Sequence, residues 1–396
     1  HAARAAATIL LVPSIWYFVT RFLKRTGERI AALLIICFGA GAGWIQMSFY
    51  SRTGTLPFVP ADVATPEASS FFTSMTFPHL TLALILIALS FALYFEAVRR
   101  EKAAPALLAG LCGLVLGFIH VVNLVVIFAV IAAYAVLTLF LYKREIFLQM
   151  GILFGAIAIW PVAYYVYLSL VQPILLPQVP VRSPALGAYL VGFAPLLILS
   201  LLYLFSLARR RILGEANLLL LCWSMVNFLM LYSYPLISQE ARTVLGLQLP
   251  LAVLASLGIY RTVLPALGLD RSLQEGWKKA GAAVVVGLLV FFTFPGSFYN
   301  ITERVSRLNA YPEAFSLSED EYEALRILQE QKGEGIVLAG DVVGNYVPGM
   351  TGKPVWLGQY DLPSHDTRYH LARLFFAETT SHAERKTFLK NHNIHF

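Results

Sequence analysis

The chain has 396 residues, of which 58% are hydrophobic and only 13% are charged, with a formal net charge of +7. A soluble globular domain carries roughly 25% charged residues, so the composition excludes an ordinary soluble protein and indicates a multi-pass membrane protein. The positive net charge does not indicate nucleic-acid binding, because the cations are scattered over short loops between apolar stretches.

The two ends of the sequence indicate a piece of a longer protein. The chain starts at His1 rather than at a methionine and stops at "NHNIHF" without a terminal signal, so we expect truncation at both ends. The first apolar run is followed, not preceded, by its basic cluster, which favours a membrane span over a signal peptide. Cys37, Cys112 and Cys222 all fall in apolar segments, which predicts packing roles and no disulfide.

Apolar segments follow one another along residues 1–297, which we predict to form a multi-span transmembrane domain. A spanning helix needs about 20 residues, and most of the segments have that length. We count ten, near 6–20, 30–50, 78–98, 104–119, 122–142, 146–170, 185–208, 215–234, 245–263 and 280–297.

The cations between these segments predict the orientation of the chain. If the segments alternate across the membrane, sixteen cations fall on one side: Arg21, Lys24, Arg25, Arg29, Arg99, Arg100, Lys102, Lys143, Arg144, Arg209, Arg210, Arg211, Arg261, Arg271, Lys278 and Lys279. Only four fall on the other side: Arg4, Arg52, Arg182 and Arg242. Because cytoplasmic loops are enriched in Lys and Arg, the first side is predicted to be cytoplasmic, in a membrane that we expect to be the prokaryotic cytoplasmic membrane.

Residues 298–396 differ in kind, with ten basic and thirteen acidic residues. "LSEDEYEALRILQEQ" predicts an amphipathic helix with acidic residues at its start. "GIVLAG" and "KPVWLG" are typical of short buried strands. We therefore expect a small, incomplete α/β domain on the extracytoplasmic side.

Polar residues from several parts of the chain are predicted to meet at the outer face. The set comprises Asp62 and Glu67 in the loop 51–77, His79 at the start of the next span, His120 and Asn123 at a tight turn, and Glu240 and Arg242 between two spans. Each also has a purely structural interpretation, such as loop solvation, helix capping, turn formation or interfacial snorkelling. A cation beside lipid is costly, however, and the planar guanidinium suits phosphate. Arg242 is therefore predicted to bind a lipid-linked phosphate.

No metal or nucleotide motif accompanies this group. The histidines and aspartate of the tail have no usual ligand spacing, and "AGDVVGNYVPGMTG" lacks the GxGxxG pattern. No bound cofactor is expected from the sequence, which leaves a need for a divalent metal open.

Three stretches resemble the GT-C superfamily of membrane glycosyltransferases, in particular the protein-mannosyltransferase and aminoarabinose-transferase group. They are "PEASSFFTSMTFPHLTLALIL", "EARTVLGLQLPLAVLASLGI" and "GNYVPGMTGKPVWLGQYDLPSHDTRYHLARLFFAE". The resemblance is to the overall layout, because none of the three is a catalytic signature.

The resemblance implies transfer of a sugar from a polyprenyl-phosphate donor to an acceptor on the outer face, with inversion at the anomeric carbon. In the family the general base follows the first span, which we expect to lie upstream of this chain. The resemblance therefore implies only secondary acidic roles for Asp62 and Glu67, phosphate binding by Arg242, and orientation of phosphate or acceptor by His79. The acceptor, whether protein, lipid or glycan, is open.

Two other functions remain open at the level of sequence. A transporter or lipid flippase would have ionisable groups near the middle of the bilayer and repeat symmetry, and neither is evident. A non-catalytic partner in cell-envelope assembly is also compatible with the segments and with the tail.

Overall fold

The computed structural model describes residues 2–172, 180–210, 213–269, 276–310, 316–358 and 365–395. The chain forms two compact units. The first comprises His1–Tyr167 with Val181–Thr302, and the second comprises Leu168–Pro180 with Glu303–Phe396. Two cations used in the orientation argument, Arg211 and Arg271, lie outside the described residues.

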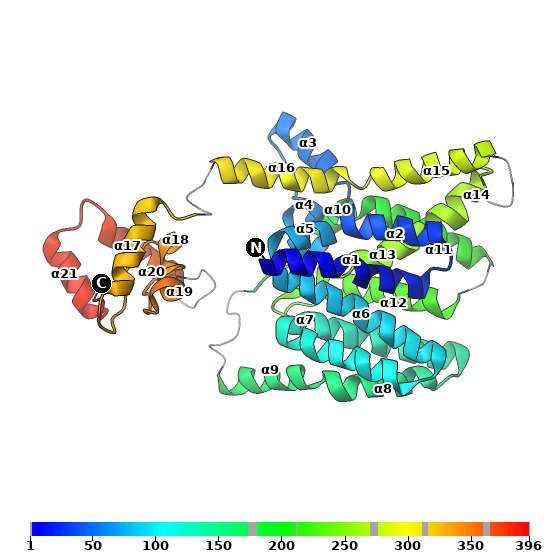
Figure 1. Ribbon diagram of the computed structural model, residues 1–396, viewed down its shortest axis with the longest axis horizontal. Coiled ribbons are helices and arrows are strands. Elements are labelled where there is room, and N and C mark those ends of the chain that lie inside the picture. Colours follow the sequence, from blue (N-terminus) through cyan, green and yellow to red (C-terminus); the bar gives the residue numbers. More distant parts are fainter. Residues whose placement is uncertain are drawn as a thin grey trace. The chain divides into compact units, whose positions relative to one another are not determined.

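The described part of the chain is built from helices (Figure 1). Up to the middle of the chain they are α1 (Ala2–Phe22), α2 (Thr26–Phe38), α3 (Gly43–Thr53), α4 (Ala61–Ala64), η1 (Pro66–Ala68), α5 (Ser70–Thr76), α6 (Pro78–Arg100), α7 (Ala103–Tyr142), α8 (Ile146–Ala158), α9 (Trp160–Val171) and α10 (Leu186–Gly192). There follow α11 (Ala194–Arg210), α12 (Glu215–Met230), η3 (Glu240–Val244), α13 (Gln248–Gly258), η4 (Ile259–Val263), α14 (Leu264–Ala266), α15 (Gly276–Phe291) and α16 (Pro295–Ala310). The second unit contains α17 (Glu319–Glu330), α18 (Asp341–Gly344), α19 (Val347–Thr351), α20 (His365–Phe376) and α21 (His382–Asn391).

The prediction of a multi-pass membrane protein is confirmed. Among the described residues, six helices are long and apolar enough to cross a membrane, or up to eight if each bent pair is one span. The bent pairs are α8 with α9, at 50°, and α10 with α11, at 79°. The sequence predicted ten segments; the count is lower because α12 has only 16 residues and because segments 104–119 and 122–142 are counted together as α7.

Helix α7 nevertheless reverses direction at His120, whose backbone angles (φ −154°, ψ 73°) are not helical. A straight helix of 40 residues would be about 60 Å long, so its ends could not meet. They do meet, because Arg144 forms an ion pair of 2.7 Å with Glu101, the residues that flank the helix. The two halves of α7 are therefore antiparallel, and His120 lies at the tip of the hairpin.

The core of the first unit is aromatic and closely packed. Trp223 of α12 stacks on Phe91 of α6 at 3.8 Å between ring centroids and meets the ring of Phe18 of α1 edge-on. Helices α11 and α13 approach so closely that a Cβ on Gly258 would lie 2.2 Å from the carbonyl oxygen of Leu199. Small residues at such crossings are the usual means of packing helices in membranes.

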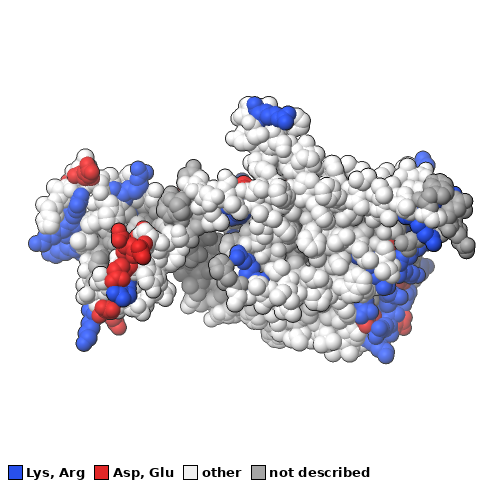
Figure 2. Space-filling model, turned by 45° about the horizontal axis from the view of Figure 1, so that its top comes forward, with Lys and Arg blue, Asp and Glu red and all other residues white. Residues whose placement is uncertain are grey.

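On the face that Figure 2 shows, charged side chains gather at one end of the first unit, and most of the remaining surface of that unit carries no charged side chain. Glu96 is buried and pairs with Arg21 at 2.9 Å and with Arg100 at 3.0 Å. Glu28 is fully buried and accepts two hydrogen bonds from Arg261. These pairs join cations that the sequence assigned to a single side of the membrane.

The prediction of an α/β domain in the tail is wrong for the part of the tail that the structure describes, which contains helices and no strand. The two expected strands form only isolated bridges, Ile336 with Ile394 and Val337 with Val355. Val337 exchanges two hydrogen bonds with the segment 354–356. The pairing stops there because Gly340 leads directly into α18. The sequence pattern nevertheless predicted correctly that these stretches are buried, since Val337, Trp356 and Leu357 are core residues.

Candidate functional site

The link between α12 and α13 carries Arg242 in the short helix η3. Its neighbour Glu240 is 5% exposed, and its carboxylate accepts hydrogen bonds from the backbone N–H groups of Ser183 (3.2 Å) and Tyr234 (2.7 Å). Thr243 donates its hydroxyl to the carbonyl of Glu240 at 2.7 Å. Both oxygens of Glu240 are therefore occupied in fixing the backbone around Arg242.

Arg242 is half-buried, and its Nε donates to Oε1 of Gln239 at 3.0 Å. No ion pair joins Arg242 to a carboxylate anywhere in the described ranges. Gln239 was not singled out from the sequence, although a glutamine three residues before an arginine on a helical turn is within reach of it. The guanidinium thus keeps its full positive charge at the edge of an apolar bundle.

His120 and Asn123, at the tip of the α7 hairpin, lie against the backbone of Arg242. Asn123 directs its Nδ2 to the carbonyl oxygen of Arg242 (3.3 Å) and to Nδ1 of His120 (2.8 Å). A carbonyl can only accept, so this contact fixes the amide with its NH₂ group toward both partners. Nδ1 of His120 is consequently the acceptor, and the ring proton lies on Nε2.

Two polar atoms of this pair have no protein partner among the described residues, although both side chains are buried. They are Nε2 of His120 and Oδ1 of Asn123. More than nine in ten buried polar groups in proteins are hydrogen-bonded, so two adjacent exceptions point to a ligand or to water. Nε2–H is a donor and Oδ1 is an acceptor, which suits an anionic oxygen beside a hydroxyl group.

His79 and Glu67 complete the surroundings of Arg242. The charge of Arg242 acts on the rings of both His79 and His120, and the charge of Glu67 also acts on His79. His79 is exposed at the first turn of α6, where its ring contacts that of Phe77 at 5.5 Å between centroids. The structure thus brings Arg242, His79 and His120 within electrostatic range of one another, and it brings Glu67 within range of His79.

Asp62 has a different set of contacts. Its Oδ2 accepts hydrogen bonds from the N–H groups of Gly41 (2.9 Å) and Gly43 (3.1 Å), and Asn300 donates to its backbone carbonyl (3.0 Å). The carboxyl is only 1% exposed, and burial raises its pKa to about 7 even though the two amides act in the opposite direction. Its contacts share no residue with those of Arg242. Asp62 thus stabilises the break between α2 and α3, and its carboxyl is not accessible to an acceptor.

Another polar residue in an apolar run, Gln248, ties the same break to α5 and α13. Its Oε1 accepts from the backbone and hydroxyl of Ser70, at 2.7 and 2.8 Å, and its Nε2 donates to the carbonyls of Gly39 and Ile35. The sequence analysis missed this residue. An amide within "LGLQLP" is a signal that could have revealed it, because a buried polar group requires partners.

None of the described residues form a group of three or more His, Cys, Asp or Glu side chains suited to a metal ion. Around Arg242 the structure places a guanidinium, an imidazole N–H donor and an amide oxygen acceptor.

Comparisons with known proteins give a likeness in structure but none in sequence. No protein-family model matches the chain, and no curated protein matches it. Two solved structures of the oligosaccharyltransferase of Archaeoglobus fulgidus are similar over 99% of this chain. The form tethered to an acceptor peptide with an NVT sequon has a TM-score of 0.53 at 13% identity, and the apo form has 0.51 at 12%.

The chain spans 56% and 57% of the length of those two structures. At 12–13% identity the likeness concerns the fold alone. The chain is a multi-pass membrane protein whose helical fold resembles that of an archaeal oligosaccharyltransferase.

Proposed function

We propose that the chain is part of a membrane glycosyltransferase. The enzyme takes a sugar from a polyprenyl-phosphate donor and transfers it to an acceptor at the outer face of the membrane. The observation that carries the proposal is the group formed by Arg242, His120 and Asn123. It combines a guanidinium that pairs with no carboxylate among the described residues with a buried N–H donor and a buried oxygen acceptor, neither of which has a partner in that part of the chain.

In this mechanism, Arg242 and Nε2–H of His120 contact the phosphate of the donor. Negative charge grows on the phosphate as the bond to the sugar breaks, so fixed cationic and N–H groups stabilise the transition state more than the ground state. Oδ1 of Asn123 accepts from a sugar hydroxyl, and His79, which lies within electrostatic range of Arg242 and Glu67, orients the phosphate or the acceptor. Asp62 supports the site from a distance, through the backbone break that it holds.

Substitution of Arg242 tests the proposal directly. Loss of one positioned donor to a developing anion typically lowers kcat by 10²–10³-fold, and we expect about that loss for Arg242→Gln. Arg242→Lys should retain part of the activity, because it keeps the charge but loses the bidentate fork. Sugar transfer is measured in vesicles that contain a polyprenyl-phosphate sugar, with the longest form of the protein that can be produced.

Arg52→Gln serves as the matched control, because Arg52 is an exposed cation of the same predicted side, on α3. It should transfer sugar at the rate of the unaltered protein. All variants are first compared by thermal unfolding, so that a folding defect is recognised. If Arg242→Gln transfers sugar at a rate within twofold of the control, the proposed role of Arg242 is refuted. If the protein moves the donor lipid across the membrane without transferring its sugar, the proposed glycosyltransferase activity is refuted.

A further inference from the structure

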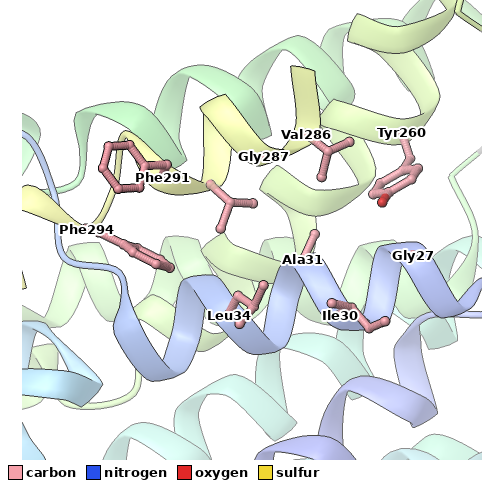
Figure 3. A pocket seen from close by; sticks show the side chains of 10 residues that line it. Gly27, Ile30, Ala31, Leu34, Tyr260, Val286, Gly287, Phe291 and Phe294 are labelled. Carbon is pink, nitrogen blue, oxygen red and sulfur yellow. The ribbon is translucent and has the colours of Figure 1, made fainter. Parts of the chain in front are cut away.

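A hollow lies between α2 and α15 on the outside of the first unit (Figure 3). Its volume is about 440 Å³, and its lining is almost wholly apolar, with Leu34, Val286 and Phe291 among the residues that form it. Gly27 and Gly287 have no side chain to fill the space, and a Cβ on Gly287 would meet no atom within 4 Å. The hollow is therefore a consequence of small residues placed where two apolar helices face each other.

Both walls of the hollow belong to helices long and apolar enough to lie in the membrane. Figure 3 shows Gly27 and Tyr260 at one end of it and Phe291 and Phe294 at the other. A groove of this kind within a bilayer accommodates a hydrocarbon chain, because its surface offers mainly apolar contacts, with the hydroxyl of Tyr260 at one end.

The end of the groove near Gly27 and Tyr260 is strongly basic. Lys24 and Arg25 directly precede α2 and are exposed, and Lys279 is exposed in the first turn of α15. Arg261 follows Tyr260 and holds the buried Glu28. Basic groups beside a pocket between membrane helices are suited to the headgroups of anionic lipids.

We infer that this groove binds an anionic phospholipid, with one acyl chain between α2 and α15 and its headgroup at Lys24, Arg25 and Lys279. The charge at one end selects the headgroup, and the hollow left by the glycines selects a chain. The polyprenyl-phosphate donor of the proposed reaction is a poorer occupant of this groove. Arg242 precedes α13 and Arg261 follows it, so the proposed phosphate site and the basic end of the groove lie at opposite ends of that helix. The inference does not depend on the proposed function.

The experiment measures lipid retained by the purified chain after extraction from vesicles of equal parts phosphatidylglycerol and phosphatidylcholine, by native mass spectrometry. We expect phosphatidylglycerol to be retained in preference. Gly287→Trp should reduce its retention at least fivefold, because an indole fills the groove. Leu288→Trp is the matched control, since Leu288 is 63% exposed on the next position of the same helix and should change nothing.

A second set of variants tests the headgroup. Removal of one cation near a membrane surface weakens binding of an anionic lipid about fivefold, so Lys24→Gln, Arg25→Gln and Lys279→Gln should each lower the preference for phosphatidylglycerol by that factor. Arg52→Gln should leave it unchanged. Equal retention of both lipids, an equal loss in Leu288→Trp, or displacement of phosphatidylglycerol by a polyprenyl phosphate would each overturn the inference.

Discussion

Replacement of Asp62 by asparagine should stabilise the protein at alkaline pH. In the folded chain, burial raises the pKa of the Asp62 carboxyl from 3.8 to about 7. An acid whose pKa is raised by folding stabilises the native state fully below its unfolded pKa, and that stability is lost as pH rises toward the folded pKa. The free energy of unfolding should therefore fall between about pH 4 and pH 7 and level off above that range.

The magnitude follows from the two pKa values. One pKa unit corresponds to 1.36 kcal/mol, so the difference between 3.8 and about 7 amounts to about 4 kcal/mol at pH 8. Little discount for solvent screening is needed, because the side chain is only 1% exposed. The amide of an asparagine cannot ionise, and its oxygen can still accept from Gly41 and Gly43. Asp62→Asn should therefore remove this loss and raise the unfolding temperature by several degrees at pH 8.

The assay is thermal unfolding in detergent, followed by tryptophan fluorescence between pH 5 and pH 8.5. The quantity of interest is the melting temperature of Asp62→Asn minus that of the unaltered chain, which should grow as pH rises. Ser51→Ala, at an exposed position of α3 that does not titrate, is the control and should give a difference that does not change with pH. A lower melting temperature for Asp62→Asn at pH 8 would show that the fold requires the ionised carboxylate, contrary to our reasoning.

Two further predictions concern the membrane helices. Gly258→Ala should destabilise the protein markedly, because the new Cβ would lie 2.2 Å from the backbone oxygen of Leu199. Gly287→Ala should be neutral or slightly stabilising, because its Cβ would meet no atom within 4 Å and alanine favours the helix. Melting temperatures of the two variants decide this, and equal values would refute the close approach of α11 and α13. Glu28→Gln should cost about 3 kcal/mol, because it breaks a buried ion pair with Arg261. The cost is measured as a loss of melting temperature, and Glu323→Gln, which breaks an exposed ion pair with Arg326, should not share it.

Periodicity and charge predicted much of the transmembrane unit because lipid permits few alternatives. A long apolar run must form a helix, since every backbone group has to be paired within the segment. What the runs do not encode is where helices bend, and so the reversal at His120 was expected only as a turn between two spans. In the tail the error was of another kind. Short apolar stretches between glycines are compatible with a strand or with any buried segment, and the partner that would decide is distant in sequence.

The candidate site was predicted in part for a similar reason. Arg242 stood out because an isolated cation beside lipid is costly, and that argument needs no structure. The contact of Asn123 with the backbone of Arg242 joins residues 119 positions apart, and no spacing rule connects them. Asp62 was expected at the site because it lies in an outer loop. Its burial beneath glycines could not be read from the sequence, since it depends on Gly41 and Gly43 turning their N–H groups toward it.

The polar residues within this apolar chain differ in how many of their polar atoms are hydrogen-bonded to protein groups. That difference helps to distinguish residues that stabilise the fold from residues suited to bind a ligand. Glu240 and Gln248 direct both of their polar atoms to protein groups, so they hold bends in the backbone and need nothing more. Asp62 leaves one oxygen without a partner, but protonation at its raised pKa removes the cost of burying a charge there. His120 and Asn123 leave a fixed donor and a fixed acceptor side by side. Protonation of His120 would add a charge without supplying a partner, so a bound ligand or water is needed to satisfy these two atoms, which lie against the backbone of Arg242.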